Sequence, residues 1–412
     1  MMVSQGSTKA RLAWCLNDVA NSAFSLVMVT AFLPVYFRQG IAEGMDSSDV
    51  DALWGYAVSA SMVLVALSSP LMGALADRRG WRKSLLLIYT GLGVSATALW
   101  WTVEPGQVLL GLTLFALANA MYEGSLVFYD ALLPGLVPPG RVGRWSGYGW
   151  AMGYIGSLGA LALALYFVSI GQASWVFVLV AAWWGGWSLP LAFGVRDMPG
   201  KKEGEYAQKL WRQSLDTLGR IRSNPDLRRF FLAFFLYNDG IATTIAFAGL
   251  YATQTLGFTA EQTIVLIGGV QVAGALGAFS LGVLTDRFGH VRMIVMTLLG
   301  WIALMLVTYV VTSKQAFWGV ALGVGLIMGA TQSASRGFLA KVAGVDAGEL
   351  FGFKAVAGKF SAILGPLIFG LVSQLTGSQR PALLAVGVFF VLGLVLMLKV
   401  DEDRACAHGL AR

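Results

Sequence analysis

The segment Gly73-Ala-Leu-Ala-Asp77-Arg78-Arg79-Gly80 decides how this chain is organised, because a similar segment recurs 209 residues later. The second copy reads Gly282-Val-Leu-Thr-Asp286-Arg287-Phe288-Gly289. Both copies keep glycine, aspartate, arginine and glycine at the same spacing, and both follow a long apolar stretch. Two copies at matching positions predict two halves of similar structure.

A second repeated element supports the same division. Asn17-Asp18 lies in the first apolar stretch of the chain, and Asn238-Asp239 lies 221 residues later, in the seventh. This offset exceeds the first by 12 residues, which is close to the length of an extra loop expected at 38–50. Each half therefore contains six apolar stretches, and an even number gives both halves the same orientation.

The composition around these repeats is that of a membrane protein. Of the 412 residues, 57% are hydrophobic and 12% are charged, and the charged share is about half that of soluble proteins. So few polar side chains cannot cover the surface of a soluble domain of this length. The composition therefore argues against a soluble enzyme, a nucleic-acid-binding protein and a disordered chain.

We expect about twelve membrane-spanning helices, because a helix needs roughly 20 mostly apolar residues to cross a bilayer. The apolar runs are too long and too uniform for a β-barrel, and open strands cannot cross lipid. The expected spans are residues 12–37, 52–76, 84–103, 107–132, 144–170, 173–195, 228–253, 262–284, 292–312, 315–340, 351–375 and 381–399.

Lysine and arginine predict the orientation of the spans, because cytoplasmic loops carry an excess of both. With the N-terminus inside, 23 of the 29 Lys and Arg lie in cytoplasmic segments, whereas Arg38, Lys314 and Arg380 lie in outer loops. We therefore expect a multi-pass protein of the plasma membrane, in bacteria the inner membrane, with both termini in the cytoplasm. The net charge of +7 then reflects orientation, and no nucleic-acid partner is expected.

Residues 196–227 form the one long polar segment and separate six spans from six. The predicted organisation is an N-terminal six-helix bundle at 1–195, a cytoplasmic linker at 196–227, and a C-terminal six-helix bundle with a short cytoplasmic tail at 228–412. Within the linker, Trp211, Leu215 and Leu218 recur at helical spacing, which predicts an amphipathic helix on the inner membrane surface. A site for a regulatory partner is the alternative.

The repeated pattern Gly-x-x-x-Asp-Arg-x-Gly resembles the motif that the major facilitator superfamily has between its second and third helices. The resemblance implies an all-α membrane protein of two pseudo-symmetric six-helix bundles, with the substrate site between the halves. It also implies that the motif is a conformational latch and binds no substrate. The residues assigned to the latch are Gly73, Asp77, Arg78 and Gly80 in the first copy, and Asp286, Arg287 and Gly289 in the second.

The residue types of the motif suit such a latch. Gly73 lets two helices approach closely, and Gly80 permits the turn. Asp77 can pair with a basic residue or cap the N-terminus of a neighbouring helix. A loop that only carries orienting positive charge is the alternative, and two copies at matching positions argue against it.

Other stretches are similar to the vacuolar-effluxer-like branch of this superfamily. They are residues 17–24 with 33–37, 128–134, 147–156, 237–240 and 351–366. Fungal relatives in that branch are implicated in amino acid efflux from vacuoles, so the resemblance implies an amino acid or a related metabolite as substrate. This chain departs from the branch at Asp130, where Asn is usual, and at Lys354, where an aromatic residue is common.

Polar side chains within apolar spans are costly unless they face a cavity or a partner. Asn17, Asp18 and Asn21 lie on adjoining polar faces of the first span, and Asn238 and Asp239 answer them in the seventh. We expect all five to contact substrate, with Asp18 and Asp239 lining a central cavity from opposite bundles. Polar packing between helices is the alternative. The remaining candidates for substrate contact are Gln332, Arg336 and Lys359.

Acidic residues within the spans are candidates for proton coupling, because a carboxyl group in apolar surroundings can hold a proton near neutral pH. Glu123 and Asp130 share one stripe of the fourth span, with Glu123 about 10 Å deeper. Asp239 is the third candidate. A salt bridge from Asp130 to Arg141 or Arg144 is the alternative for that residue.

The sequence predicts a secondary active transporter that exports a small polar solute by alternating access, with proton coupling as an option. A broad-specificity drug/proton antiporter and a non-transporting receptor or scaffold are the alternatives. No enzyme activity, cofactor or metal site is expected, because the two His and two Cys are far apart and no nucleotide-binding motif follows a strand. The expected partners are membrane lipid, a small-molecule substrate and protons, and the expected state is a monomer.

Overall fold

The computed structural model describes residues 6–200, 210–361 and 363–410. Within these ranges the regular elements are helices, and no strand is present. The first half contains α1 (Thr8–Ala23), η1 (Phe24–Ala31), α2 (Leu33–Tyr36), η2 (Phe37–Ile41), α3 (Ser47–Arg79), α4 (Arg82–Leu99), η3 (Trp100–Thr102), α5 (Val108–Leu136), η4 (Pro139–Arg141), α6 (Val142–Ser169) and α7 (Trp175–Gly194).

The remaining helices belong to the linker and the second half. They are α8 (Leu210–Ser223), α9 (Pro225–Leu250), η6 (Tyr251–Thr255), α10 (Ala260–Phe288), α11 (His290–Val310), α12 (Lys314–Ala343), η7 (Gly344–Asp346), α13 (Ala347–Ser361), α14 (Leu364–Thr376), α15 (Gln379–Met397) and α16 (Glu402–Leu410).

Twelve helical stretches of the described chain are long and apolar enough to cross a membrane, which confirms the expected number. The first is Thr8–Ile41 and the last is Gln379–Met397. Large apolar side chains are exposed along them: Leu67 is 71% exposed, Leu109 80% and Phe193 87%. Apolar surface of this extent suits contact with lipid.

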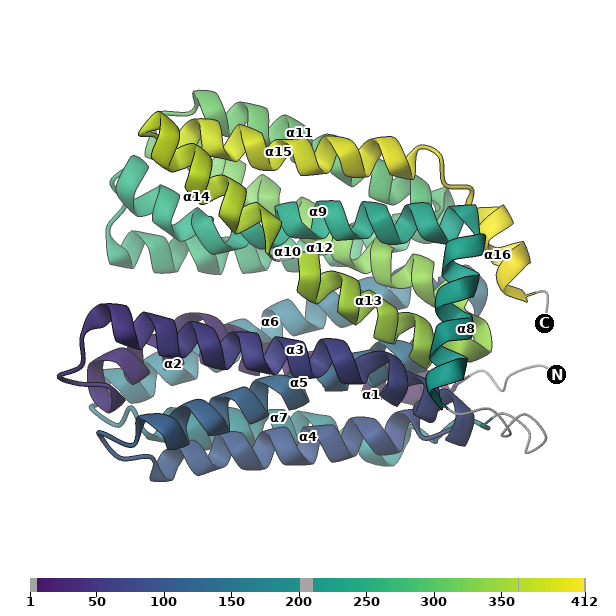
Figure 1. The fold of residues 1–412 in the computed structure, drawn as a ribbon, viewed down its shortest axis with the longest axis horizontal. Helices are drawn as coiled ribbons and strands as arrows, with labels where there is room; N and C mark the ends of the chain where they lie inside the picture. The colour runs from purple at the N-terminus through teal and green to yellow at the C-terminus, as the bar shows by residue number, and fades with distance from the viewer. Residues whose placement is uncertain (1–5, 201–209, 362, 411–412) are drawn as a thin grey trace. The chain divides into compact units, whose positions relative to one another are not determined.

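Two of the expected spans are interrupted. Span 1 breaks at Phe32, after which α2 begins with Pro34 in its first turn. Span 11, expected as one helix at 351–375, consists of two helices, α13 and α14, which are labelled separately in Figure 1. Proline lacks an N–H group and clashes with the preceding helical turn, so it is tolerated near the start of a helix. Pro366 stands at the third position of α14, which explains why a new helix begins there.

The chain divides into two compact units. Unit 1 comprises Met1–Val137, Met152–Trp211 and Asp346–Gly352, and unit 2 comprises Pro138–Ala151, Arg212–Val345 and Phe353–Arg412. Each unit corresponds to one half of the sequence apart from two short segments. The start of α6 belongs to unit 2, and the start of α13 belongs to unit 1.

In unit 1, α4 packs along α5, and α1 packs along α7 (Figure 1). Trp14 of α1 stacks on Tyr129 of α5 with ring centroids 4.6 Å apart. The core of this unit is rich in aromatic side chains, including Phe24, Trp100, Phe115, Phe177 and Trp184. These large side chains fill the space between helices whose outer faces remain apolar and exposed.

In unit 2, α10 packs along α12, and α15 lies against both α9 and α11. Trp301 of α11 stacks on Phe390 of α15 with ring centroids 4.8 Å apart. Small residues let α10 and α12 approach closely, because a Cβ on Gly277 would lie 1.9 Å from the carbonyl oxygen of Leu326. Close backbone contact through glycine is typical of membrane helices.

The helix predicted within the linker is present as α8. Trp211, Leu215 and Leu218 are exposed on it, whereas Ser214 and Thr217 are buried on another face. Trp211, Leu215 and Leu218 therefore form an exposed apolar stripe on α8. The linker residues 201–209 lie outside the described residues.

Candidate functional site

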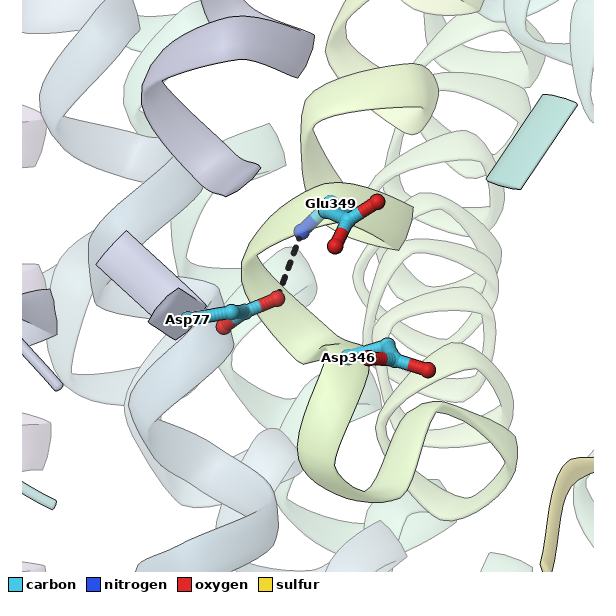
Figure 2. A group of neighbouring side chains, drawn as sticks. All are labelled: Asp77, Asp346 and Glu349. Atoms are coloured by element: carbon cyan, nitrogen blue, oxygen red, sulfur yellow. Dashed lines mark hydrogen bonds between the residues drawn. The ribbon is translucent and has the colours of Figure 1, made fainter. Parts of the chain in front are cut away.

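The first copy of the repeated motif forms a buried helix cap in unit 1 (Figure 2). Asp77 lies in the last turn of α3, and its two carboxylate oxygens accept hydrogen bonds from the Gly348 and Glu349 backbone N–H groups at 2.9 and 3.0 Å. These amides belong to the first turn of α13, where a helix has no partners of its own for them. A carboxylate also balances the partial positive charge of a helix N-terminus. Asp77 therefore caps a neighbouring helix, as its residue type predicts.

Asp77 also pairs with a basic residue, and this residue is Arg82. The Arg82 Nη2 atom lies 2.6 Å from Asp77 Oδ1, and the two side chains are 6% and 0% exposed. Arg82 also donates to the Ala131 carbonyl oxygen at 3.2 Å. Arg78, which the motif assigned to the latch, is half-buried. The base of this cap is therefore the residue two positions beyond the motif.

Glycine is required where α3 meets the start of α13. A Cβ on Gly73 would lie 2.1 Å from the Gly348 carbonyl oxygen, and one on Gly352 would lie 2.6 Å from the Ser69 carbonyl oxygen. Gly80 ends α3 with a φ of +71°, in the left-handed region that glycine favours. The close approach brings the carboxylate of α3 within hydrogen-bond distance of the amides of α13.

The second copy forms a matching cap in unit 2. Asp286, near the end of α10, accepts hydrogen bonds from the Gly143 N–H at 2.8 Å and the Arg144 N–H at 3.2 Å, in the first turn of α6. The Arg144 Nε atom lies 3.8 Å from Asp286 Oδ2. Arg287 is exposed, and Gly289 has a φ of +92°. Both motif aspartates thus cap a helix that belongs to the other half of the sequence.

The helices that receive the caps share a sequence pattern of their own. Gly143 and Gly147 begin α6, and Gly348 and Gly352 begin α13, each pair 205 residues apart from the other. A Cβ on Gly147 would lie 2.2 Å from the Ala278 carbonyl oxygen, so this pair also permits close approach. A Gly-x-x-x-Gly spacing repeated at the start of spans 5 and 11 could have indicated both capped helices.

Two further carboxylates, unpredicted from the sequence, cap the helices that follow the motif loops. In unit 1, Asp197 accepts hydrogen bonds from the Lys83 N–H at 2.6 Å and the Ser84 N–H at 3.2 Å, at the start of α4. In unit 2, Glu402 accepts one from the Val291 N–H at 3.0 Å, at the start of α11. Each carboxylate follows the last span of its half. In the sequence, an acidic residue shortly after the last span of each half could have indicated both caps.

Glu402, in the C-terminal tail, contacts two side chains at the ends of other helices. Its Oε1 atom lies 3.0 Å from His290 Nδ1 and 2.8 Å from Lys341 Nζ. Burial opposes its ionisation, but the hydrogen bonds from His290, Lys341 and the α11 amide outweigh burial and hold the pKa of the carboxyl well below its usual range. Arg404 of the same helix pairs with Asp226 Oδ2 at 2.5 Å. The tail is therefore bound to the ends of α9, α11 and α12.

The Asn-Asp pair of unit 1 lies inside the helix packing. Asp18 accepts a hydrogen bond from the Tyr129 hydroxyl at 2.7 Å, and Asn21 Oδ1 accepts one from Trp184 Nε1 at 3.0 Å. Asn17 is fully buried, and its amide has no hydrogen-bond partner among the residues that the structure describes. None of the three lies on an open surface in this conformation. Their contact with substrate stays a prediction.

The Asn-Asp pair of unit 2 contacts both helices of the interrupted span. Asn238 Nδ2 donates to Ser361 Oγ at 2.7 Å, at the end of α13. Asp239 Oδ1 and Oδ2 each accept from the Gly365 N–H at 2.9 Å, at the start of α14. Asp239 is fully buried, so the cavity-lining position expected for it is not observed in this conformation. The reason is that its carboxylate caps a helix.

Arg336, expected to contact substrate, binds protein groups in unit 2. It is 1% exposed, and it donates to Ser146 Oγ at 3.0 Å and to the Ser146 carbonyl oxygen at 2.7 Å. Its guanidinium lies over the Trp150 ring at 5.3 Å. Arg336 therefore joins α12 to the start of α6. Gln332 and Lys359 are half-buried, and substrate contact by all three stays a prediction.

The two carboxylates proposed for proton coupling in the first half lie on α5. Glu123 is half-buried, and Asp130 is 9% exposed. Arg144, one of the two bases considered for Asp130, lies 3.8 Å from Asp286 instead. A coupling role for Glu123 and Asp130 stays a prediction.

Three carboxyl groups gather at the first cap, where oxygen atoms of Asp77, Asp346 and Glu349 lie within 4.8 Å of one another (Figure 2). Oxygen ligands of this kind suit Mg²⁺ or Ca²⁺. Both oxygens of Asp77 already accept helix amides, and Arg82 balances its charge. We therefore attribute the cluster to helix capping and assign no metal to it.

Solved structures resemble this fold over nearly its whole length. FucP, a major facilitator superfamily transporter solved in the outward conformation, matches with a TM-score of 0.75 and 15% identity over 95% of this chain and 98% of that chain. The human organic anion transporter MFSD10 matches with a TM-score of 0.73 and 18% identity over the same shares. The fold and the twelve spans define an integral membrane protein with the major facilitator fold.

Sequence comparison identifies the family within that class. The family model described as "Vacuole effluxer Atg22 like" matches residues 6–142 and 140–409. The uncharacterised MFS-type transporter YxiO of Bacillus subtilis (strain 168) is 30% identical over 96% of each chain. Autophagy-related protein 22-1 of Aspergillus niger is 26% identical over 86% of this chain and 74% of that protein. The chain belongs to the vacuole effluxer Atg22-like family and is a transporter of the major facilitator superfamily.

Proposed function

We propose that this protein exports a small polar solute, an amino acid or a related metabolite, by alternating access. The observation that carries the proposal is the presence of ionisable side chains within the spans of both halves, led by Asp18, Glu123 and Asp239. Such groups are costly in a membrane and mark substrate or ion pathways. Membership of a family described as vacuole effluxers supports efflux of a solute.

The two helix caps give the proposed cycle a physical basis. Asp77 and Asp286 each bind backbone amides from the other half of the sequence. Such a cap is either formed or lost, and its loss exposes a carboxylate and two amides at once. A local change of this kind biases an element that has two states. We propose that the two caps together stabilise one state of the cycle.

Proton coupling is the second part of the proposal. Glu123 and Asp130 lie on one spanning helix, α5, and a charge at that depth is costly without compensation. Taking up a proton removes the charge and changes which conformation is favoured. Asp239 is the third candidate for this role.

We also propose in which membrane the protein lies and how it is oriented there. The 23 to three distribution of Lys and Arg supports cytoplasmic termini in the plasma membrane, in bacteria the inner membrane. The exposed stripe of Trp211, Leu215 and Leu218 supports a place for α8 along the inner membrane surface. A monomeric state remains a prediction.

A substrate screen in proteoliposomes tests the function directly. Purified protein is reconstituted, and efflux of amino acids, related metabolites and organic cations is measured with and without an imposed pH gradient. We expect efflux of at least one amino acid or metabolite, with a rate that responds to the gradient. Movement of organic cations alone would favour a drug antiporter, and movement of no solute would contradict the proposal.

The variant Glu123→Gln tests the coupling. If Glu123 carries the coupled proton, this variant should lose the pH dependence of transport while solute exchange persists, because the amide cannot take up the proton. The matched control is Glu104→Gln, at an exposed carboxylate between α4 and α5. If Glu123→Gln keeps the pH profile of the parent protein, then Glu123 is structural, and Asp130 or Asp239 becomes the candidate.

A further inference from the structure

The start of α14 binds a carboxylate inside unit 2. The N-cap residue, Ile363, makes no side-chain cap, so the first amides of α14 depend on a partner from outside the helix. Asp239 of α9 supplies it, with both carboxylate oxygens 2.9 Å from the Gly365 nitrogen. A helix N-terminus favours anions through its free amides and its partial positive charge. In this structure the anion is a side chain of the protein itself.

A second group is directed at the same place. The Thr243 hydroxyl is buried, the residue is 1% exposed, and the oxygen has no hydrogen-bond partner within the described part of the chain. A Cβ on Gly365 would lie 1.9 Å from Thr243 Oγ1 and 2.7 Å from Asp239 Oδ1. The hydroxyl therefore lies beside both the amide and the carboxylate. A buried hydroxyl without a partner is unfavourable, which indicates that it binds something in another state.

Asn238, the other residue of the Asn-Asp pair, holds the end of α13 in place beside this site. Asn238 Nδ2 donates to Ser361 Oγ at 2.7 Å, and that hydroxyl donates to the Gly358 carbonyl oxygen at 2.9 Å. Asn238 thus fixes the end of α13 while Asp239 holds the start of α14. The position of the free amide is therefore set by two adjacent residues of one helix.

Charged side chains on the helices around α9 either contact groups other than Asp239 or lie on α13. Arg336 of α12 binds Ser146, and Arg380 of α15 donates to the Tyr309 and Val311 carbonyl oxygens. Lys354 of α13 lies over the Phe234 ring at 5.8 Å, and Lys359 is half-buried on the same helix. In α16, Glu402 and Arg404 pair with Lys341 and Asp226. The Asp239 carboxylate accepts its hydrogen bonds from the neutral Gly365 amide, and α14 carries no charged residue.

We propose that the Gly365 amide and the Thr243 hydroxyl bind the carboxylate group of the transported solute once Asp239 has taken up a proton. The inference rests on the proposed transport function and names its substrate class, solutes that carry a carboxylate. The proton joins one carboxylate oxygen of Asp239, and the resulting neutral carboxyl group no longer competes for the amide. The new O–H donates to Thr243 Oγ1, and the Thr243 hydroxyl and the Gly365 N–H then donate to the solute carboxylate.

Charge balance at this site predicts how the movement of protons and of the solute is coupled. The start of α14 faces one negative charge in both states, on Asp239 without the solute and on the solute when Asp239 is protonated. One proton therefore binds with one carboxylate, and both move in the same direction. Acid on the side of loading should accelerate transport from that side. A drug/proton antiporter would show the opposite sign.

The first experiment measures binding without transport. The probes are alanine, leucine and phenylalanine, each compared with its α-carboxamide, in thermal-stabilisation assays on the purified full-length protein at acidic and neutral pH. We expect at least one amino acid to stabilise the protein, more strongly at acidic pH, and its carboxamide to have no effect. Equal stabilisation by a carboxamide, or no stabilisation by any carboxylate, overturns the inference whatever the transport screen shows.

Three variants locate the effect. Asp239→Asn imitates the protonated state and should bind the carboxylate with no dependence on pH. Thr243→Val keeps the shape and removes the hydroxyl, and it should weaken carboxylate binding about tenfold, the loss of one hydrogen bond. Thr244→Val is the matched control, because the Thr244 hydroxyl donates to the Gly240 carbonyl oxygen within α9. Equal effects of the two threonine variants would contradict the inference even if Asp239→Asn does not fold.

The last measurement separates this inference from the transport function. In proteoliposomes, inside-acid buffer should accelerate efflux of the amino acid, and Asp239→Asn should abolish this acceleration while exchange continues. Efflux that responds with the opposite sign overturns the carboxylate site and leaves transport intact. Absence of efflux for every solute contradicts the transport function, whereas the binding result above still decides the site.

Discussion

Unit 1 and unit 2 contain the same Asn-Asp pair, yet the two aspartates have different partners. Asp18 accepts the Tyr129 hydroxyl, whereas Asp239 caps α14 through the Gly365 amide. The surroundings of the two aspartates otherwise match. In unit 1 a Cβ on Gly153 of α6 would lie 2.6 Å from Ser22 Oγ, and in unit 2 a Cβ on Gly365 would likewise meet the Thr243 hydroxyl. The difference lies in the facing helix: α6 is continuous, and span 11 is interrupted. The repeat preserves which helices meet, and the interruption decides what the carboxylate binds.

The caps formed by Asp77 and Asp286 differ less than Asp18 and Asp239 do, and they differ in strength. Asp77 is fully buried with Arg82 at 2.6 Å, whereas Asp286 is 10% exposed and its base, Arg144, is 40% exposed at 3.8 Å. Water screens the second pair more than the first. Unit 1 therefore contains the stronger of two similar caps, and variants in equivalent positions should separate them.

The largest effect is expected for Asp77→Ala compared with Asp286→Ala. Removing Asp77 leaves the buried Arg82 without its carboxylate, a change of about 3–5 kcal/mol in the stability of the capped state. Removing Asp286 leaves two amides without a cap, about 1–3 kcal/mol. Cysteine accessibility at the start of α13 and thermal unfolding in detergent measure both. Asp77→Asn, which keeps an acceptor for the amides, is the control, and equal effects of the two alanine variants would contradict the ranking.

The next largest effect is expected for Gly365→Ala compared with Gly153→Ala. The added methyl group meets Thr243 Oγ1 at 1.9 Å in unit 2 and Ser22 Oγ at 2.6 Å in unit 1. Overpacking costs about 1–3 kcal/mol, and the shorter distance should give the larger loss. Unfolding temperature and solute exchange are the measurements. Gly370→Ala, where a Cβ has no atom within 4 Å, serves as the control in α14. A more damaging substitution at Gly153 would show that the two sites are not equivalent.

A smaller effect concerns the tail carboxylates. Asp197→Ala and Glu402→Ala should each cost about 0.5–2 kcal/mol, the value of a lost helix cap. Glu402→Gln adds a test by pH, because hydrogen bonds hold the pKa of Glu402 below its usual range. A lowered folded-state pKa gives stability that is present above the ordinary carboxyl range and lost as the pH falls towards the folded pKa. The gap in unfolding temperature between the parent protein and Glu402→Gln should therefore narrow on acidification, and a constant gap would argue against ionic capping.

The smallest effect compares Asn238→Ala with Asn17→Ala. Asn238 donates to Ser361, so its loss should cost about 0.5–1.5 kcal/mol. The amide of Asn17 lacks a hydrogen-bond partner among the described residues, so its removal should leave the free energy of unfolding nearly unchanged or raise it. Chemical or thermal unfolding checks both. If Asn17→Ala keeps its stability but loses solute exchange, the amide serves the substrate, and if both properties survive, the predicted substrate contact of Asn17 is wrong.

The amino-acid sequence by itself determined the number of spans, predicted two halves, and limited Asp77 to pairing with a base or capping a helix. Apolar runs long enough to cross a bilayer are a local property, and a repeated motif marks equivalent positions without any knowledge of contacts. The residue type also limits the choices for a buried aspartate, because a carboxylate within a span must find a base, an amide or a proton.

The tertiary structure alone decided the partners. In this conformation it pairs Asp77 with Arg82, places the Arg336 guanidinium on Ser146, and gives the Asp239 carboxylate the Gly365 amide at the start of α14. It also revealed the caps formed by Asp197 and Glu402, which lie more than 110 residues from the helices they cap. The physical reason is that a hydrogen bond depends on which helix ends meet within about 3 Å, and helix packing sets that distance between residues far apart in the chain.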